Sequence, residues 1–388
     1  MFMQETMRWF GPHDIVRLSD IRQAGCEGVV TALHQIPVGE VWPIAAIEER
    51  KAMIEKEGMS WTVVESLPVS EDIKRQSGDY KTHIAYYKES LQNLAACGIK
   101  VITYNFMPVM DWVRTDISYT LPSGGKALYF ERAAFIAFDL FMLKRPLAEN
   151  DYTPAAIATA EHWWETHADA EKQAVFQNAM LGLPGSTGRF TPAEILAALD
   201  SYKGIDTARL KAHLFYFLRE VVPVAESLGL KMAVHPDDPP YPVLGLPRIV
   251  STAQDLRDII ASVPSPANGL CFCSGSLGVR PDNDLMSIIA ELGAHIHFLH
   301  LRNTRRDEQG NFFEADHLNG DVDMVAVVRA LLLLMKERRV ALPVRPDHGH
   351  QLLDDHTKTT YPGYSAIGRL KGLAELRGLQ RGLASILS

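Results

Sequence analysis

The sequence predicts an α/β fold in the form of a (β/α)8 barrel, and three observations support this prediction. Eight short apolar runs of strand-like composition follow one another along the chain, and helical stretches fill the gaps between them. Most of these runs are continuously apolar rather than alternating, which is typical of parallel strands covered by helices. Each of the last four runs ends in or near a residue type that binds metals, as expected where parallel strands meet at a barrel mouth.

The predicted elements alternate in the order that βα units require. The eight predicted strands cover residues 7–11, 28–33, 61–68, 100–109, 231–236, 269–273, 295–302 and 342–347. The clearest helices between them cover residues 18–25, 44–58, 83–98, 206–229 and 321–339. The first of these helices begins at the capping pair Ser19-Asp20 and ends at Gly25, and the second ends at Gly58.

The connection between the fourth and fifth predicted strands is long. Between Val109 and Lys231 no run has a convincing strand pattern, whereas residues 130–146, 153–168 and 171–182 read as helices. A Gly/Pro-rich loop at 182–190 leads into a further helix. We expect one barrel domain over residues 1–388 with a mostly helical insertion at 110–228 above the barrel mouth. A separate helical domain is the alternative, although no Ser/Gly-rich linker marks a boundary.

Composition narrows the class of protein. The chain has 388 residues, of which 47% are hydrophobic and 22% charged, and its formal net charge is −8. The negative charge does not favour binding to nucleic acid or to a membrane surface. The amino terminus lacks the pattern of a signal peptide, and no apolar run approaches the length of a membrane span. The four cysteines show no zinc-finger or CxxC spacing, so we expect a reducing, cytoplasmic environment.

Four residues at strand ends form a candidate metal site: His235, Cys273, His300 and Asp347. Two imidazoles, a thiolate and a carboxylate suit a redox-capable or Lewis-acidic divalent ion. Each residue alone has a simpler explanation, such as a histidine capping a rigid loop or an inert buried cysteine. Four such residues on four consecutive predicted strands are much less readily explained by chance.

Neighbouring residues compete for some of these roles. Cys271 would face the same side of its strand as Cys273, but Cys273 is nearer the carboxyl end and is the better ligand. His297 and His300 have opposite parity, so only one can point inward, and we assign His297 to the core or the barrel exterior. The Ser-Gly-Ser-Leu-Gly stretch after Cys273 reads as a flexible turn that lets the backbone approach a ligand.

Other polar residues near strand ends are candidates for catalysis and substrate binding. His348 has a suitable pKa range for an acid or a base, and Arg302 could bind a carboxylate with its forked guanidinium. The remaining candidates are Arg345, Glu65, Asn105, Arg114, Trp9, His34 and Tyr364. No phosphate-binding loop, dinucleotide fingerprint, nucleophile elbow, HExxH pair or basic patch interleaved with aromatic residues occurs in the sequence.

The chain resembles the mannonate dehydratase family over nearly its whole length. The resemblance is carried by the motifs MRWFGPHD, GVVTALHQIPVGEVW, VVESLPVSEDIK, YNFMPVMDWVRTD, MAVHPDDPP, GLPRIVST, CSGSLGVRPDND, HLNGDVDM, RPDHGHQLLDD and PGYSAIGRLKGLAELRG. It implies a xylose-isomerase-like barrel and dehydration of D-mannonate to 2-dehydro-3-deoxy-D-gluconate in hexuronate breakdown. It also implies a homodimer and an Fe2+ or Mn2+ cofactor.

The same resemblance implies roles for individual residues. The family's metal ligands correspond to His235, Cys273, His300 and Asp347, and its proton-transfer groups to His348 and Tyr364. In this mechanism a base takes the C2 proton of the sugar acid while an acid assists departure of the C3 hydroxyl. The sequence does not decide which of the two groups is the base, and Asp347 is counted with the catalytic residues as well as with the ligands.

Two other functions stay open at this point. The first is a metal-dependent sugar or sugar-acid isomerase on the same barrel, although such sites more often use carboxylate-rich ligands than a thiolate. The second is a non-catalytic sugar-acid binding protein, which a complete ligand set and an acid–base pair argue against. The soft thiolate suits Fe2+ better than Mg2+, and zinc would fit it equally well by softness.

Overall fold

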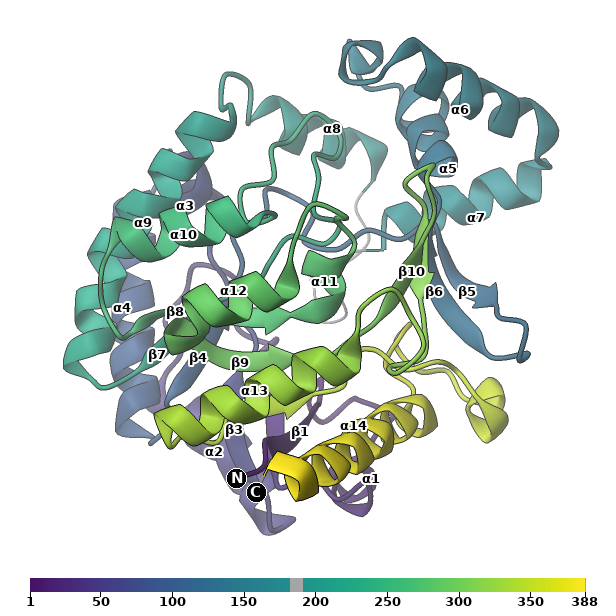
Figure 1. Cartoon of the computed structure of the whole chain (residues 1–388). Helices are drawn as coiled ribbons and strands as arrows, with labels where there is room; N and C mark the ends of the chain where they lie inside the picture. Colours follow the sequence, from purple (N-terminus) through teal and green to yellow (C-terminus); the bar gives the residue numbers. More distant parts are fainter. Residues whose placement is uncertain (182–190, 388) are drawn as a thin grey trace.

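A closed barrel of eight parallel strands forms the centre of the molecule (Figure 1). The computed structural model describes residues 1–181 and 191–387, so the Gly/Pro-rich loop expected at 182–190 lies outside the described residues. All eight predicted strands are confirmed, with bounds that differ by a few residues. They are β1 (Gln4–Arg8), β2 (Gly28–Thr31), β3 (Ser60–Val64), β4 (Val101–Tyr104), β7 (Lys231–Val234), β8 (Asn268–Cys273), β9 (Ile296–His300) and β12 (Pro343–Arg345).

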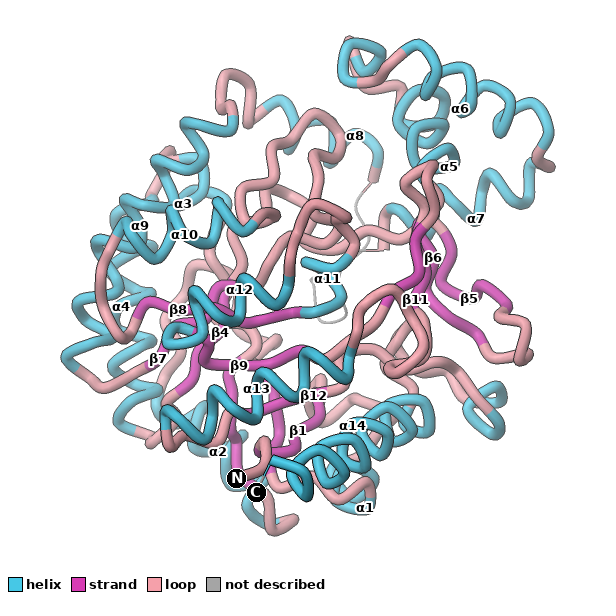
Figure 2. Tube along the Cα trace, viewed as in Figure 1, coloured by secondary structure: helices cyan, strands magenta, loops and turns pink. Residues whose placement is uncertain are grey.

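Helices follow the barrel strands and cover the outside of the barrel (Figure 2). They are α1 (Leu18–Gln23), α2 (Ile44–Lys56), α3 (Glu71–Arg75), α4 (Tyr80–Ala96), α9 (Thr207–Ser227), α10 (Ala253–Ser262), α11 (Ser274–Gly278), α12 (Leu285–Leu292), α13 (Met324–Arg338) and α14 (Ala366–Leu387). The two chain ends meet at the amino-terminal side of the barrel, where the backbone N–H of Met3 donates to Gln380 Oε1 at 2.9 Å.

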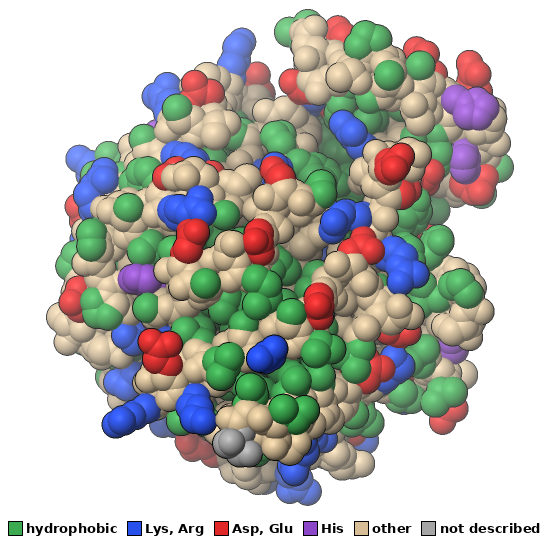
Figure 3. All heavy atoms as spheres, in the orientation of Figure 1, with side chains coloured by type: hydrophobic (Ala, Val, Ile, Leu, Met, Phe, Trp, Pro, Cys, Tyr) green, Lys and Arg blue, Asp and Glu red, His purple; other side chains and the backbone are tan. Residues whose placement is uncertain are grey.

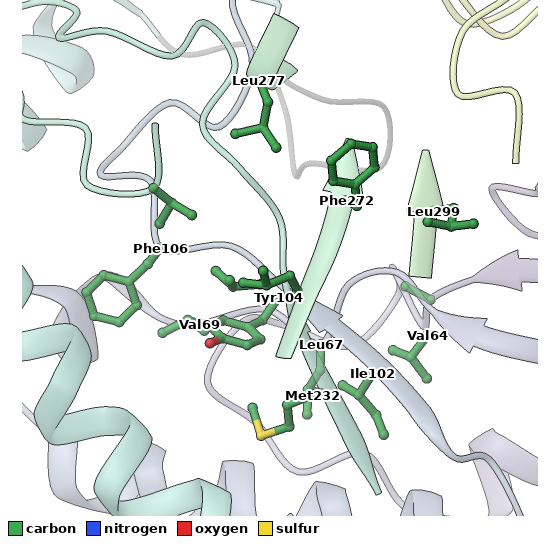
Figure 4. Close-up of a cluster of buried hydrophobic side chains, with 14 of the residues drawn as sticks. Val64, Leu67, Val69, Ile102, Tyr104, Phe106, Met232, Phe272, Leu277 and Leu299 are labelled. Atoms are coloured by element: carbon green, nitrogen blue, oxygen red, sulfur yellow. The ribbon is translucent and has the colours of Figure 1, made fainter. Parts of the chain in front are cut away.

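The strands separate two apolar layers by residue parity. One set of side chains packs together inside the barrel: Val30, Val63, Ala233, Cys271 and Phe298. The alternate side chains, which Figure 4 shows for Val64, Ile102, Met232, Phe272 and Leu299, belong to the larger core between strands and helices. Because the interior layer is filled, the barrel is a packed core, and polar residues can gather only above that layer.

A second sheet contradicts part of the sequence prediction. The region 110–228 does contain strands, β5 (Asp116–Thr120) and β6 (Lys126–Phe130), which pair as an antiparallel hairpin. Two short strands that follow β9, namely β10 (Thr304–Arg306) and β11 (Phe312–Glu314), complete the sheet in the order β10-β11-β6-β5. Most of β5 is only partly buried and β10 and β11 have three residues each, so neither gives a strong apolar pattern.

The rest of the long connection is helical, as predicted. It contains α5 (Arg132–Ala137), η1 (Phe138–Leu143), η2 (Ala148–Asp151), α6 (Pro154–Thr166), α7 (Asp169–Ala179) and α8 (Pro192–Asp200). The helices α5 to α7 form a lobe beside the barrel (Figure 1). Figure 3 shows a hollow between this lobe and the barrel, where Phe130, Tyr152 and Tyr241 are among the lining residues. Among the described residues, no helix is both long and apolar enough to cross a membrane.

Candidate metal centre and active site

Strand parity positions three of the candidate ligands directly above the interior apolar layer. His235, Cys273 and His300 each lie two residues beyond an interior residue of their own strand, namely Ala233, Cys271 and Phe298. The register between β8 and β9 places Cys273 and His300 at the same height along the barrel axis, because these two residues are paired. The prediction that His300 rather than His297 points inward is confirmed, since His297 is buried on the opposite face, beside Gly269.

The ligand atoms of these three residues form a compact group that could hold a metal ion. One such atom from each of His235, Cys273 and His300 lies within 4.8 Å of the others. Asp347 completes the predicted set, because its carboxylate oxygens lie 3.8 Å from Cys273 Sγ and 3.8 Å from His300 Nδ1. The structure therefore brings all four predicted ligands together from four separate strand ends.

The surroundings constrain the two imidazoles of the candidate metal site. His235 Nδ1 lies 2.6 Å from the carbonyl oxygen of Pro236, to which it can donate, and this leaves Nε2 directed at His300 Nδ1, 3.0 Å away. Glu65 Oε2 lies 3.4 Å from the other ring nitrogen of His300, in the carboxylate–histidine arrangement common around metals. Burial lowers the pKa of His235, which favours the neutral, ligating form of its ring.

Arg345 fixes the carboxylates beside this group. Its guanidinium donates to both carboxylate oxygens of Glu65, at 2.6 and 2.9 Å, and its Nη1 lies 2.6 Å from Asp347 Oδ1. Burial alone would raise the pKa of Asp347, but the charges of His348, Arg345 and His300 hold it well below the usual value. The site therefore contains an ionised carboxylate next to the thiol and the imidazoles.

A second set of buried ion pairs adjoins the first. Arg114 donates to both oxygens of Asp238, at 2.8 and 3.0 Å, and to Glu314 at 3.1 Å. Arg302 donates to the same two carboxylates, each at 2.7 Å. His348 Nδ1 lies 3.2 Å from Glu314 Oε1, which attaches the predicted acid–base residue to this network. Two guanidinium groups thus face two carboxylates, and their charges balance.

A cavity opens above the ligand group at the carboxyl end of the barrel. It is lined by Arg8, Glu65, Ser66, Asn105, Met107, Asp111, Trp112, His235, Asp238, Arg302, Arg345, Asp347, His348 and Tyr364. The rings of His348 and Tyr364 meet edge to face with their centroids 5.2 Å apart. Burial raises the pKa of Tyr364, so its phenol keeps its proton at neutral pH. The two predicted proton-transfer groups therefore lie side by side on the cavity wall.

Three predicted substrate-binding residues are not among the residues that line this cavity. Trp9 is buried in the main core beneath the Arg50 guanidinium, which lies 5.2 Å from its ring centroid. His34 contacts Phe10, and burial followed by the charge of Arg8 lowers its pKa to about 3. Arg114 contacts two residues of the cavity wall, Asp238 by a hydrogen bond and Trp112 with its guanidinium 5.1 Å from the ring centroid. Their predicted role in substrate binding stays a prediction.

Sequence reasoning missed several residues of the site. Arg8, Asp238 and Asp111 line the cavity, and Glu314 contacts His348. Position at a strand end could have indicated Arg8, which is the last residue of β1, and Asp238 lies in the acidic loop that follows His235. Glu314 gave no signal, because its three-residue strand belongs to the sheet that the sequence pattern did not reveal.

The Ser-Gly-Ser-Leu-Gly segment also differs from the prediction. It forms the short helix α11 rather than a flexible turn, and the Cys273 sulfur accepts a hydrogen bond from the Ser276 backbone at its start. A side chain at Gly275 would meet the stem of Arg302 at 2.5 Å. The glycine is therefore needed for close packing against Arg302 and not for the approach of a ligand.

Comparisons with known proteins agree with this architecture. The family model described as D-mannonate dehydratase (UxuA) matches residues 3–387. Mannonate dehydratase from Marinomonas sp. (strain MWYL1) is 53% identical, and the match covers 99% of this chain and 100% of that protein. The mannonate dehydratase of Chromohalobacter salexigens is 51% identical, with the same two coverages.

Solved structures extend the comparison to three dimensions. The crystal structure of mannonate dehydratase from Streptococcus suis serotype 2 has a TM-score of 0.78 and 34% identity, and the match covers 100% of this chain and 95% of that chain. A xylose isomerase domain protein from Planctomyces limnophilus has a TM-score of 0.53 at 10% identity, with coverages of 99% and 100%. The second likeness concerns the fold alone and agrees with the predicted xylose-isomerase-like barrel.

Proposed function

The chain belongs to the mannonate dehydratase family and dehydrates D-mannonate, and we propose that it does so in the cavity at the carboxyl end of the barrel. The products are 2-dehydro-3-deoxy-D-gluconate and water. The observation that carries the proposal is the meeting of four candidate ligands with a histidine and a tyrosine around one cavity. Parallel barrels use this end for catalysis.

A divalent ion fits the donor set of His235, Cys273, His300 and Asp347. When bound, it would polarise the oxygens of the sugar acid and so ease loss of the proton at C2. The thiolate and the two imidazoles suit a borderline-soft ion, which supports the choice of Fe2+ over Mg2+. Glu65 would orient His300, and Arg345 would hold both Glu65 and Asp347 in place.

His348 and Tyr364 would transfer the protons. One of them takes the proton from C2, and the other donates to the C3 hydroxyl as the C3–O bond breaks and water leaves. The electron pair of the former C2–H bond forms the C2–C3 double bond. The resulting enol becomes the 2-keto acid by taking a proton at C3 and releasing one from the C2 hydroxyl.

The carboxylate of the substrate needs a cation that is not already neutralised. The sequence predicts Arg302 for this role and Arg345 for substrate binding, but Arg302 already lies beside three carboxylates, those of Asp238, Glu314 and Asp347. Arg345 lies beside two, those of Glu65 and Asp347. The Arg8 side chain makes one hydrogen bond among the described residues, to Glu65 at 3.1 Å, and its Nε is buried without a partner, as is Nη2 of Arg302. Arg8 is therefore the best-placed anchor, with Arg302 and Arg345 beside it, and Glu65 and Asn105 near the substrate hydroxyls.

Three further expectations belong to the same proposal: a homodimer, a cytoplasmic location and a helical insertion that serves as an accessory to a single barrel domain. The runner-up activity, isomerisation of a sugar or sugar acid, would use the same ligands. It lacks an observation of its own, and the three mannonate dehydratases compared above, at 53%, 51% and 34% identity, favour the dehydratase activity.

Metal analysis of purified variants tests the proposed centre. We expect about one bound Fe2+ or Mn2+ per chain in the wild type, and a large loss of both metal and turnover in Cys273→Ser and Asp347→Asn. The buried Cys271→Ser is the matched control for Cys273, because its sulfur lies one layer deeper in the barrel. Full metal content and full activity in Cys273→Ser would contradict the assigned ligand set.

A further inference from the structure

The hydrogen bond between Glu314 and His348 assigns a role to a residue outside the cavity lining. His348 Nδ1 lies 3.2 Å from Glu314 Oε1, and both side chains are buried. The other ring nitrogen, Nε2, lies 4.0 Å from Asp347 Oδ1, on the side where His348 lines the cavity. The imidazole therefore has one nitrogen paired with Glu314, while the other lies near the candidate ligand Asp347.

Glu314 is held as an ionised acceptor. Arg302 Nε donates to its Oε2 at 2.7 Å, and Arg114 Nη2 donates to its Oε1 at 3.1 Å. Burial alone would raise the pKa of Glu314, but the charges of Arg302 and His348 and the hydrogen bond from His348 lower it to about 2. An ionised carboxylate can only accept hydrogen bonds, so Nδ1 of His348 must carry the proton.

We propose that Glu314 is a positioning residue that fixes His348 in the tautomer with a protonated Nδ1, leaving Nε2 free for proton transfer. The inference rests on the proposed function, because it gives Glu314 its role through His348. It follows the general logic in which a buried carboxylate orients an acid–base histidine.

In this arrangement the second sheet positions Glu314 beside His348. Glu314 is the last residue of β11, where it pairs with Thr304 of β10, and β11 in turn pairs with β6. Arg114 precedes β5, whereas Asp238 and Arg302 follow the barrel strands β7 and β9. The ion pairs among these four side chains thus join the sheet to the barrel, and the orientation of His348 depends on that junction.

Kinetics of Glu314→Gln and Glu314→Asp test the proposal. Glutamine keeps the shape but can donate to Nδ1 and reverse the tautomer, so kcat should fall on the order of 10²-fold with little change in KM. Aspartate keeps the charge on a shorter side chain, so the kcat of Glu314→Asp should lie between those of the wild type and Glu314→Gln. Glu161→Gln makes the same chemical change at an exposed carboxylate and is the matched control, which should leave kcat unchanged.

A double-mutant cycle separates positioning from structural support. If Glu314 acts through His348, then Glu314→Gln should cause little further loss of kcat in a His348→Gln background. Losses that multiply would overturn the proposal. Nitrogen NMR of the imidazoles in metal-free, full-length protein gives an independent readout: the Nδ1–H signal of His348 should be present in the wild type and lost in Glu314→Gln, and an unchanged tautomer would overturn it.

Two different outcomes distinguish the proposed function from the role of Glu314. Wild-type protein that forms no 2-keto-3-deoxy acid from D-mannonate would contradict the proposed function itself. Active wild type, inactive His348→Gln and a fully active Glu314→Gln would contradict only the role of Glu314.

Discussion

At the scale of single residues, the site depends on how each charge is balanced. Arg114 and Arg302 are neutralised by Asp238 and Glu314, and Arg345 binds Glu65 with two hydrogen bonds. If Asp347 serves as a metal ligand, Glu65 alone faces the charges of Arg345 and Arg8. Of these four guanidinium groups, that of Arg8 is then the least compensated, because its side chain makes the fewest hydrogen bonds among the described residues.

Substitution of Arg8 by methionine tests this balance. We expect KM for D-mannonate to rise on the order of 10- to 100-fold, because a charged hydrogen bond contributes about 1.5–3 kcal/mol, while kcat changes less. Arg17→Met is the matched control, since the Arg17 side chain is 75% exposed and pairs only with Asp20 in the described structure. Steady-state kinetics of both variants provide the measurement, and an unchanged KM in Arg8→Met would exclude it as the carboxylate anchor.

At the scale of elements, the second sheet links the barrel to the insertion. Phe312 of β11 is buried, stacks on Phe130 of β6 with centroids 5.4 Å apart, and lies under the guanidinium of Arg114 at 4.9 Å. This packing holds together the strand pair that carries Glu314. Stability and catalysis are therefore expected to be coupled at this position.

We predict that Phe312→Ala lowers the free energy of unfolding by about 3–5 kcal/mol through the cavity it leaves. It should also reduce kcat at temperatures where the protein stays folded, because β11 would lose its register beside His348. Chemical denaturation followed by circular dichroism, together with kinetics, checks both effects. Ile386→Ala is the control, since Ile386 is 79% exposed, and an equal effect of the two substitutions would refute the argument.

The elements also show where sequence reasoning succeeds and where it stops. Apolar runs predicted all eight barrel strands, because parallel strands covered on both faces are mostly apolar. The exception is β1, whose sequence Gln-Glu-Thr-Met-Arg is mostly polar and which the prediction met only at Met7 and Arg8. Residues at the ends of those runs, such as His235 and Cys273, were found for the same reason. The sheet that carries Glu314 was missed, because β6 and β11 pair across a large sequence separation and β11 has only three residues.

At the scale of the whole molecule, buried ion pairs make the free energy of unfolding depend on pH. Glu314 has a pKa of about 2 in the folded chain, well below the value of about 4.3 for an unfolded glutamate. A depressed carboxylate pKa adds stability that is fully present above the unfolded pKa and is lost as the pH falls toward the folded one. For Glu314 that window runs from about pH 4.5 down to about pH 2.

The wild type should therefore be more stable than Glu314→Gln above this pH window and should lose that extra stability within it. We expect a difference in unfolding free energy of roughly 3 kcal/mol near neutral pH that shrinks as the pH drops below about 4.5. Urea unfolding at a series of pH values measures it. The exposed Glu161→Gln serves as the control, and a difference between wild type and Glu314→Gln that stays constant down to pH 3 would contradict the depressed pKa.

The central claim is that the cavity dehydrates D-mannonate with a bound divalent ion and the pair His348 and Tyr364. The most direct measurement is NMR of D-mannonate turnover in D2O, with metal-stripped protein before and after anaerobic reloading with Fe2+ or Mn2+. We predict 2-dehydro-3-deoxy-D-gluconate carrying solvent deuterium at C3, formed only after reloading and lost in His348→Gln and Tyr364→Phe. An isomerised sugar acid in place of the keto-deoxy acid, or no product from correctly loaded protein, would contradict the claim.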